Sequence, residues 1–471
     1  ARDRIGVKPF FYTAPSNLFL FASEIKALLA HPMVKAEIDT DSIAEIMLIG
    51  PGRTPGYGVF RGIKELPPAH CGFYDRDGFK FWRYWKLKDQ AHMDSFEETA
   101  AKVRELVIDA IQRQLVSDVP VGTFLSGGLD SSIISSVADE FLRAHGKQLR
   151  TFSVDYKDND IYFQRSKFQP NSDRSYIERM NQYLTSEHHF IVLETDDLVD
   201  ALYSAVEARD LPGMADIDSS LILFCREIKR YATVALSGEC ADEIFGGYPW
   251  YRDKEIRERY GFPWAQSTGY RIGFLRPEIA ERIDAYDYVD KRYRDTLALT
   301  SVLPERSSEE RRMKEMVNLN LNWFMQTLLD RKDRMSMYNG LEVRVPYCDY
   351  RIAEYLYSVP WAMKDYNNQE KGLLRTAMRG ILPDEILWRK KSPYPKTHHP
   401  EYLKAVSGKL RDIIHDPQSP ILQLIDQKAL DKLLSADNPV PWYGQLMTTP
   451  QTIAYFLQIN YWLEIYHINI V

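Results

Sequence analysis

The sequence predicts an α/β fold built around a parallel β-sheet, on the basis of three observations. Short apolar runs alternate with helical patterns between residues 119 and 236, a turn with two glycines joins the first of these runs to a helix, and mainly helical sequence follows beyond residue 255. Strands that alternate with helices predict a parallel sheet covered on both faces. The 471 residues, 45% of them hydrophobic, are enough for a sizeable core.

The first 88 residues are rich in strand patterns, including a hairpin with Asp77-Gly78 at its turn. The expected elements are strands at 10–12 and 18–22, short helices at 23–30 and 41–48, and the hairpin at 71–85. So few strands do not form an independently stable sheet. We therefore expect residues 1–88 to be the C-terminal portion of one domain, and residues 89–471 to form a second domain.

The second domain begins with an amphipathic helix, because apolar residues recur at helical spacing from Val103 to Leu115. The elements expected after it are strands at 119–125, 149–155, 190–193 and 233–236, helices at 131–144 and 175–184, and long amphipathic stretches around 309–330 and 450–466. In such a fold, ligands bind beyond the carboxyl ends of the parallel strands.

Composition excludes several classes of protein. The formal charge of −6, from 60 basic and 66 acidic side chains, argues against a dedicated nucleic-acid binder. No apolar run reaches the roughly 18 residues that a membrane span needs. Four cysteines without a CxxC pair argue against a disulfide scaffold or a structural zinc site, and they favour a reducing, cytoplasmic location.

The most informative stretch is residues 119–132, where an apolar strand leads through Gly127 and Gly128 into a helix. Two glycines let backbone N–H groups approach an anion, and the N-terminus of a helix attracts one. Hydroxyl groups flank the glycines at Ser126, Ser131 and Ser132. The stretch therefore predicts a phosphate-binding loop rather than a turn without a ligand.

Asp130 lies at the start of this helix, where its charge would repel a phosphate. A carboxylate in that position is better explained as a ligand for Mg²⁺, which prefers oxygen donors. The loop is not a Walker A motif, because no Gly-Lys-Ser or Gly-Lys-Thr follows it. Hydrolysis of a terminal phosphate is therefore not the expected reaction.

Residues 126–132 resemble the pyrophosphate-binding loop of the N-type ATP pyrophosphatases, which adenylate a substrate and release pyrophosphate. Other stretches resemble glutamine-hydrolysing asparagine synthetases within that group. They are 236–248, 333–349, 371–375, 382–383 and 389–391, with 1–9 and 21–27 resembling the family's glutaminase domain. The resemblance implies an adenine nucleotide α-hydrolase-like synthetase domain with a helical C-terminal part, preceded by the end of an α+β glutaminase domain of the Ntn type.

The resemblance implies ATP-dependent synthesis of asparagine, with ATP and Mg²⁺ as cofactors. Aspartate would be adenylated to β-aspartyl-AMP, and ammonia, from glutamine in the full-length enzyme, would then displace AMP. The alternative is a related adenylating cyclase, such as a β-lactam synthetase or a peptide-cyclising enzyme, with an internal amine as nucleophile. The expected partners are these small molecules, without nucleic acid or membrane, and the oligomeric state is left open, with a homodimer as one option.

The resemblance also implies roles for individual residues. Glu239 would lie beside the acyl-adenylate, Lys391 would contact the phosphates, and Asp130 and Asp242 would hold Mg²⁺. ATP or pyrophosphate would be bound by Leu125, Ser126, Gly127, Gly128, Asp130, Ser131, Ser132, Val154, Ser237 and Gly238. Two further residues, Arg344 and Asp349, would either place substrate or form a structural ion pair.

Two positions depart from the family's pattern. Cys240 stands where the family usually has glycine, so a positive φ there would strain the backbone or narrow the substrate pocket. The family's glutaminase nucleophile is an amino-terminal cysteine, whereas this chain begins with Ala1 and has its first cysteine at Cys71. We therefore expect this polypeptide to use free ammonia and not to hydrolyse glutamine; a longer native chain that begins with cysteine would change that expectation.

Overall fold

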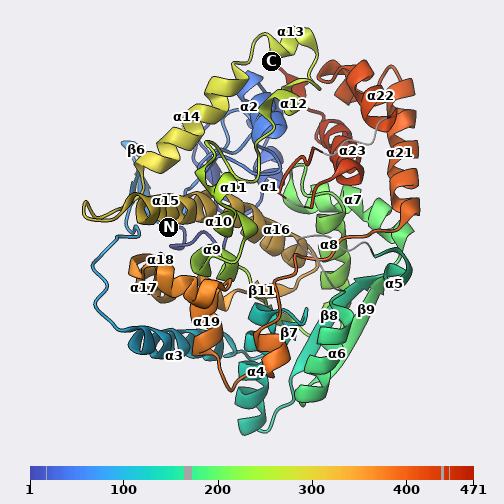
Figure 1. The fold of residues 1–471 in the computed structure, drawn as a ribbon. Coiled ribbons are helices and arrows are strands. Elements are labelled where there is room, and N and C mark those ends of the chain that lie inside the picture. The colour runs from blue at the N-terminus through green and yellow to red at the C-terminus, as the bar shows by residue number, and fades with distance from the viewer. Residues whose placement is uncertain (17, 164–171, 436–439, 445) are drawn as a thin grey trace.

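A five-stranded parallel sheet lies in the lower half of the molecule in Figure 1, in the order β11-β10-β7-β8-β9. The computed structural model describes residues 1–471 except 17, 164–171, 436–439 and 445. The strands are Val121–Phe124 (β7), Arg150–Tyr156 (β8), Glu187–Leu193 (β9), Val234–Leu236 (β10) and Glu342–Arg344 (β11). The α/β class with a parallel sheet is therefore confirmed.

The order of the strands reverses between β7 and β10. The chain passes outward from β7 to β8 and β9, then returns across the sheet to β10 and β11. Every pairing in this sheet is parallel, so the carboxyl ends of β7 and β10 lie side by side. A crevice forms outside the strands at such a reversal, and α/β proteins bind ligands there. The fold therefore brings together the residues that follow Phe124 and Leu236.

The connections between the strands are helical. Helix α4 (Leu129–Ala144) follows β7, α6 (Arg174–Tyr183) follows β8, and α7 (Thr195–Arg209) and α8 (Asp216–Ile228) connect β9 to β10. Connections of this kind are right-handed in almost all proteins, which places the outgoing and returning helices on opposite faces of the sheet.

A long helical run packs against α8. It consists of α15 (Ser308–Leu319), a π-helical turn over Asn320–Phe324 and α16 (Met325–Tyr338). Helix α16 contacts both α8 and β11. One face of α16 is buried, and several charged side chains lie on it. These side chains are therefore in the interior, near the carboxyl ends of the strands.

The remaining helices surround these layers. They are Ile25–Leu29 (α1), Thr40–Ala44 (α2), Phe96–Gln114 (α3), Asn159–Tyr162 (α5), Ala241–Phe245 (α9), Pro249–Arg252 (α10), Lys254–Glu258 (α11), Thr268–Ile272 (α12), Pro277–Ala280 (α13), Ala285–Ala298 (α14), Tyr350–Ser358 (α17), Trp361–Lys364 (α18), Gly372–Ala377 (α19), Asp384–Leu387 (α20), Pro400–His415 (α21), Gln427–Ser435 (α22) and Thr449–Ile465 (α23). Within the described ranges, none of the helices is long and apolar enough to cross a membrane.

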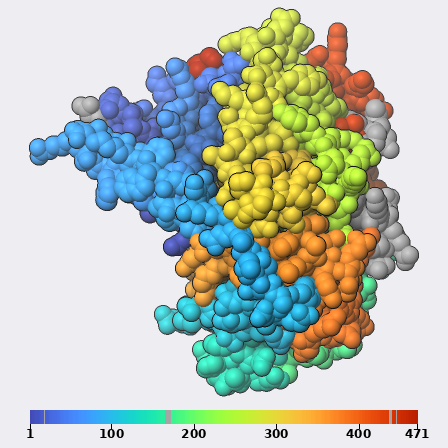
Figure 2. Space-filling view, turned by 60° about the vertical axis from the view of Figure 1, so that its left-hand side comes forward, coloured from blue at the N-terminus to red at the C-terminus, as the bar shows by residue number. Residues whose placement is uncertain are grey.

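Five of the strands in the described part of the first 88 residues form two small antiparallel sheets. Strands Phe11–Thr13 (β1), Leu20–Ala22 (β2) and Lys64–Glu65 (β4) make one sheet, and His70–Asp75 (β5) and Gly78–Arg83 (β6) make the expected hairpin. In Figure 2 the light-blue part of the chain, which includes this hairpin, projects from one side of the molecule. The hairpin exposes aromatic side chains, among them Phe73 and Trp82.

This N-terminal region shares a core with the C-terminal end of the chain. Strand β3 (Glu37–Ile38) pairs in parallel with β12 (Asn469–Ile470), and the rings of Phe60 and Trp462 lie 5.4 Å apart in an edge-on arrangement. The hydroxyl of Tyr455 in α23 donates a hydrogen bond to the carbonyl of Ile46 at 2.8 Å. Segments at opposite ends of the sequence are therefore packed as neighbours.

Candidate active site

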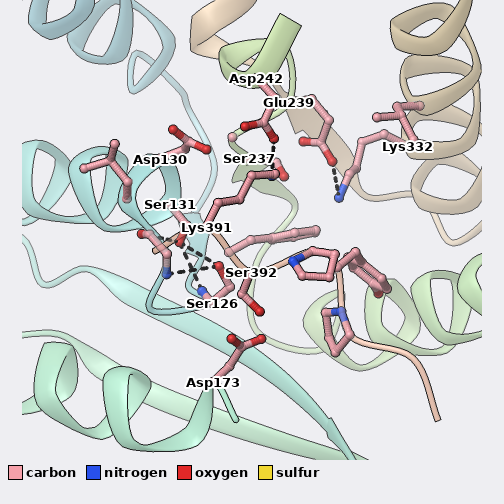
Figure 3. A pocket seen from close by; sticks show the side chains of 18 of the residues that line it. Ser126, Asp130, Ser131, Asp173, Ser237, Glu239, Asp242, Lys332, Lys391 and Ser392 are labelled. Atoms are coloured by element: carbon pink, nitrogen blue, oxygen red, sulfur yellow. Dashed lines mark hydrogen bonds and ion pairs between the residues drawn. The ribbon is translucent and has the colours of Figure 1, made fainter. Parts of the chain in front are cut away.

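A cavity of about 250 Å³ lies at the point where the strand order reverses. Its walls come from the residues after β7, β8 and β10, from α16, and from the chain around Lys371 and Lys391. The residues expected from the sequence that line it are Leu125, Ser126, Gly128, Asp130, Ser131, Val154, Ser237, Gly238, Glu239, Asp242 and Lys391. Residues that are far apart in the sequence thus converge on one cavity (Figure 3).

The loop after β7 is held by hydrogen bonds between its own hydroxyl groups. The Oγ atoms of Ser126 and Ser131 lie 3.0 Å apart, and the hydroxyl of Ser131 donates to the carbonyl of Gly128 at 3.2 Å. Gly128 is the N-cap of α4 and lines the cavity, so the free N–H groups of the first helical turn are directed at it. The loop therefore has the geometry of an anion site at a helix N-terminus.

Two residues of this loop do not line the cavity. Gly127 has a φ of +66°, and a Cβ there would lie 2.7 Å from Cβ of Tyr176 and 2.8 Å from the backbone N of Ile177. Ser132 is buried, and its N–H donates to the carbonyl of Gly128. Gly127 and Ser132 therefore shape the loop, and the cavity is bounded by their neighbours.

The turn after β10 approaches the first loop closely. A Cβ on Gly238 would lie 3.1 Å from Cβ of Asp130, so glycine permits this approach. Cys240 has a φ of +81°, in the left-handed region, where a residue other than glycine is uncommon. Its thiol is buried, with Sγ 2.9 Å from Sδ of Met325. The short helix α9 then directs Asp242 into the cavity.

Two aspartates and two lysines form an ionic cluster in the cavity. The Nζ of Lys371 lies 2.5 Å from both Oδ2 of Asp130 and Oδ1 of Asp242, and the Nζ of Lys391 lies 2.5 Å from Oδ2 of Asp242. Burial raises the pKa of Asp130 even though Lys371 opposes it. Burial acts in the same direction on Asp242, but Lys371 and Lys391 outweigh it and lower the pKa of that carboxyl to about 2.

Glu239 forms a second ion pair, with Lys332 of α16. The Nζ of Lys332 lies 2.9 Å from Oε1 of Glu239, and the Oε2 atom is buried and accepts no hydrogen bond from any described residue. Burial acts to raise the pKa of Glu239, but Lys332 and the hydroxyl of Ser237 outweigh it and hold the pKa below its usual value. Glu239 is therefore a carboxylate at neutral pH, with one oxygen available to a ligand.

Arg344 and Asp349 lie outside this cavity, and each takes part in local contacts. Arg344 pairs with Glu342 at 2.9 Å and donates to the carbonyls of Gln114 and Val116. Asp349 caps α17 and pairs with Arg351 at 2.5 Å. Neither residue lines the cavity, and they do not pair with each other, because each is held by a partner near it in the fold.

Several charged residues of the cavity were given no role from the sequence. Lys332 and Arg331 enter it from α16, and Lys371 enters it from the residue before α19. Arg389 donates to the carbonyl of Ser126 at 3.3 Å and pairs with Asp173, so it fixes the serine–glycine loop from the opposite side. Lys371 and Arg389 lie in the stretches 371–375 and 389–391 that resemble the family's C-terminal elements, but the sequence does not reveal which lysine meets which carboxylate.

Among the residues that the structure describes, no cluster of three or more His, Cys, Asp or Glu side chains could hold a metal ion. The carboxylates of Asp130 and Asp242 share the ammonium group of Lys371. Oδ1 of Asp130 is buried and has no hydrogen-bond partner among the described residues. Mg²⁺ is commonly held by one or two carboxylates together with substrate phosphates and water. The donor set therefore fits Mg²⁺ that arrives with a phosphate ligand.

The doubly wound sheet, the serine–glycine loop and the paired carboxylates define an α/β protein with a candidate anion site at its strand-order reversal. Comparison with known proteins then identifies the family. The family model described as asparagine synthase matches residues 102–464, and the one described as a glutamine amidotransferase domain matches residues 1–85. The chain belongs to the asparagine synthase family, which confirms the resemblance and the carbon–nitrogen ligase class expected from the sequence.

Individual relatives agree with this assignment. The chain is 53% identical over 474 residues to glutamine-hydrolysing asparagine synthetase 3 of Bacillus subtilis, covering 100% of this chain and 77% of that protein. It is 28% identical over 478 residues to glutamine-hydrolysing asparagine synthetase 1 of the same organism, covering 93% and 72%. Among solved structures, NMN synthetase from Francisella tularensis matches 33% of this chain and 60% of that chain at 14% identity and a TM-score of 0.21, a likeness too low to carry an argument.

Proposed function

We propose that this chain makes asparagine from aspartate, ATP and ammonia. The side-chain carboxylate of aspartate attacks the α-phosphorus of ATP, the bond to the bridging oxygen breaks, and pyrophosphate leaves. Ammonia then attacks the acyl carbon of β-aspartyl-AMP, and AMP leaves. Adenylation is needed because a free carboxylate is a poor electrophile at neutral pH.

One observation carries this proposal: the loop after β7 and the turn after β10 meet at the strand-order reversal, with Asp130 and Asp242 sharing one lysine. This arrangement provides hydroxyl and N–H donors for phosphate on one side and carboxylates for a cation on the other. We assign ATP and pyrophosphate binding to Leu125, Ser126, Gly128, Asp130, Ser131, Val154, Ser237 and Gly238, with Gly127 and Ser132 shaping the loop.

Magnesium completes the proposed phosphate site. Asp130 and Asp242 would hold Mg²⁺, which neutralises charge on the leaving pyrophosphate when bound. Lys391, and Lys371 once it is released from the carboxylates, are positioned to donate to the same phosphate oxygens. Such preorganised charge is usually the largest contribution to catalysis.

In our proposal, Glu239 and Lys332 lie at the end of the cavity where the acyl-adenylate reacts with ammonia. Figure 3 shows their side chains pointing toward one another, and in this view the pair lies apart from Ser126 and Ser131. The free Oε2 of Glu239 is suited to accept a proton from ammonia as it attacks the acyl carbon. General-base assistance of this kind typically contributes about 10²–10⁴-fold to the rate.

The organisation of the chain supports the same proposal. We place the boundary between the amidotransferase portion and the synthetase domain at residues 88 and 89, because the two family matches end at 85 and begin at 102. A cytoplasmic location is supported by the cysteines, which are all free: Cys71, Cys225, Cys240 and Cys348.

Exchange of labelled pyrophosphate into ATP tests the adenylation step. We expect exchange that depends on aspartate and on Mg²⁺, and we expect Asp130→Ala to abolish it. Exchange that proceeds without aspartate would contradict the proposed substrate. Unchanged exchange in Asp130→Ala would remove Asp130 from the phosphate site.

A further inference from the structure

Lys371 sits between the two carboxylates that we assign to Mg²⁺. Its Nζ lies 2.5 Å from Oδ2 of Asp130 and 2.5 Å from Oδ1 of Asp242, and its side chain is only 3% exposed. Lys391 contacts only one of these aspartates, Asp242. Lys371 is thus the cation that joins the pair.

The fold directs Lys371 to this position. Its backbone has a φ of +55°, in the left-handed region, immediately before α19. A Cβ on Gly247 would lie 2.2 Å from Cε of Lys371 and 2.0 Å from Oδ1 of Asp242, so the glycine leaves space for the lysine and the carboxylate together. A left-handed lysine backbone is uncommon and indicates that the local structure fixes this residue.

We infer that the ammonium group of Lys371 is the internal counter-ion of Asp130 and Asp242 and competes with a divalent cation for them. This inference rests on the proposed Mg²⁺ site. Two adjacent buried carboxylates repel each other, and a shared cation stabilises both as anions. A metal ion must displace Lys371 to reach the same oxygens.

Competition between Lys371 and a divalent metal ion determines the order in which metal and nucleotide bind. The described part of the chain offers no cluster of three or more metal-ligating side chains, so the protein alone is a poor Mg²⁺ ligand. Phosphate oxygens of ATP provide further ligands to the metal and, at the same time, an acceptor for the displaced ammonium. Divalent metal therefore binds together with nucleotide and binds weakly before it.

Mn²⁺ binding to the nucleotide-free protein, followed by electron paramagnetic resonance, tests this inference. We expect Lys371→Met to bind Mn²⁺ about tenfold more tightly than the unmodified protein, because the competing positive charge is gone. Lys371→Gln is a second variant with the same expected direction, and Lys371→Arg, which keeps the charge, is expected to show no gain. Lys390→Met is the matched control, since it removes a nearby exposed lysine that does not line the cavity.

Adding Asp242→Asn to Lys371→Met shows where the metal binds, and we expect it to remove the gain in affinity. Unchanged or weaker Mn²⁺ binding in folded Lys371→Met and Lys371→Gln would overturn the inference. An equal gain in Lys390→Met, or a gain that survives Asp242→Asn, would also overturn it. The proposed function fails separately, through loss of aspartate-dependent pyrophosphate exchange in the unmodified protein.

Discussion

Lys332 holds Glu239 in its ionised form, with Nζ of the lysine 2.9 Å from Oε1 of the glutamate. The two residues come from segments nearly a hundred positions apart in the sequence, since Glu239 follows β10 and Lys332 lies within α16. The lysine also lies 4.4 Å from the centre of the Phe124 ring, in the strand that leads to the serine–glycine loop. One side chain therefore connects both turns of the candidate site.

Lys332→Met is expected to shift the pH dependence of asparagine formation. Loss of the ammonium removes the strongest influence that lowers the pKa of Glu239, so the acidic limb of the kcat profile moves to higher pH. Because one member of a buried ion pair is left alone, the variant also loses about 3 kcal/mol of stability. Lys332→Arg, which keeps the charge, should retain the position of the limb. A profile in Lys332→Met identical to that of the unmodified protein would contradict the role of this pair.

Gly127→Ala is expected to disrupt the phosphate loop. A Cβ at this position meets Tyr176 and Ile177 at less than 3 Å, on a backbone with a φ of +66°. Gly146 is the matched control, because its φ is +68° and no atom lies within 4 Å of its Cβ position. Gly146→Ala should cost about 1 kcal/mol of stability from backbone strain alone.

Affinity for ATP, measured by calorimetry, separates these two variants. We expect Gly127→Ala to lose most of its ATP affinity and Gly146→Ala to keep it. Equal ATP affinity in both variants would show that the shape of the loop is not set at Gly127.

Glu243 should make stability depend on pH. Burial, together with the adjacent Asp242, raises the pKa of its carboxyl from 4.5 to about 7. Below pH 4.5 the carboxyl is protonated in the folded and unfolded chains alike; between pH 4.5 and 7 only the folded chain keeps the proton, so stability falls as the pH rises through this window. Glu243→Gln removes this dependence and keeps a partner for the hydroxyl of Tyr248, which donates to Oε1 at 2.8 Å.

Urea unfolding of both proteins at pH 5 and pH 7 measures the effect. The free energy of unfolding of the unmodified protein should fall by about 2 kcal/mol more than that of Glu243→Gln between these pH values. Parallel changes in the two proteins would show that Glu243 is not the group responsible.

Cys240→Gly is expected to be tolerated, because glycine adopts a φ of +81° without strain. Relief of that strain is worth about 1 kcal/mol, which offsets part of the packing lost at the buried thiol. Cys240→Val should be destabilised, since a β-branched side chain is strained in this backbone conformation and crowds Met325. Thermal unfolding midpoints rank the variants, and a Val variant as stable as the Gly variant would contradict this explanation.

Much of the fold could be predicted from the sequence because it is recorded in local patterns. The alternation of strands and helices from 119 to 193 reproduces β7, α4, β8, α6 and β9, and the hairpin turn falls next to Asp77-Gly78. The elements expected from the sequence do not include α8. Helices α7 and α16 pack against it, and nearly all of its residues are buried, among them polar ones such as Asp216 and Asp218 that are typical of a surface. Strand β11 is only 3 residues long, which is too short for a clear pattern in the sequence, and only its pairing with β10 identifies it as a strand.

Some residues of the candidate site could likewise be predicted from the sequence, and others could not. The serine–glycine loop and the turn around Glu239 are continuous in the sequence, so their residues could be found there. The ion pairs of Lys332 and Lys371 could not, because the folding of α16 and α19 onto the sheet decides which carboxylate each lysine meets. Arg344 and Asp349 stand close together in the sequence, yet neither reaches the cavity.

Transfer of oxygen from aspartate to AMP tests the central claim most directly. Aspartate labelled with heavy oxygen in its side-chain carboxylate is incubated with the protein, ATP, Mg²⁺ and ammonium, and the AMP and asparagine are analysed by mass spectrometry. Attack of the carboxylate on the α-phosphorus predicts one labelled oxygen in the phosphate of each AMP, with pyrophosphate and asparagine formed in equal amounts. Unlabelled AMP, or ADP and inorganic phosphate in place of AMP and pyrophosphate, would contradict the account.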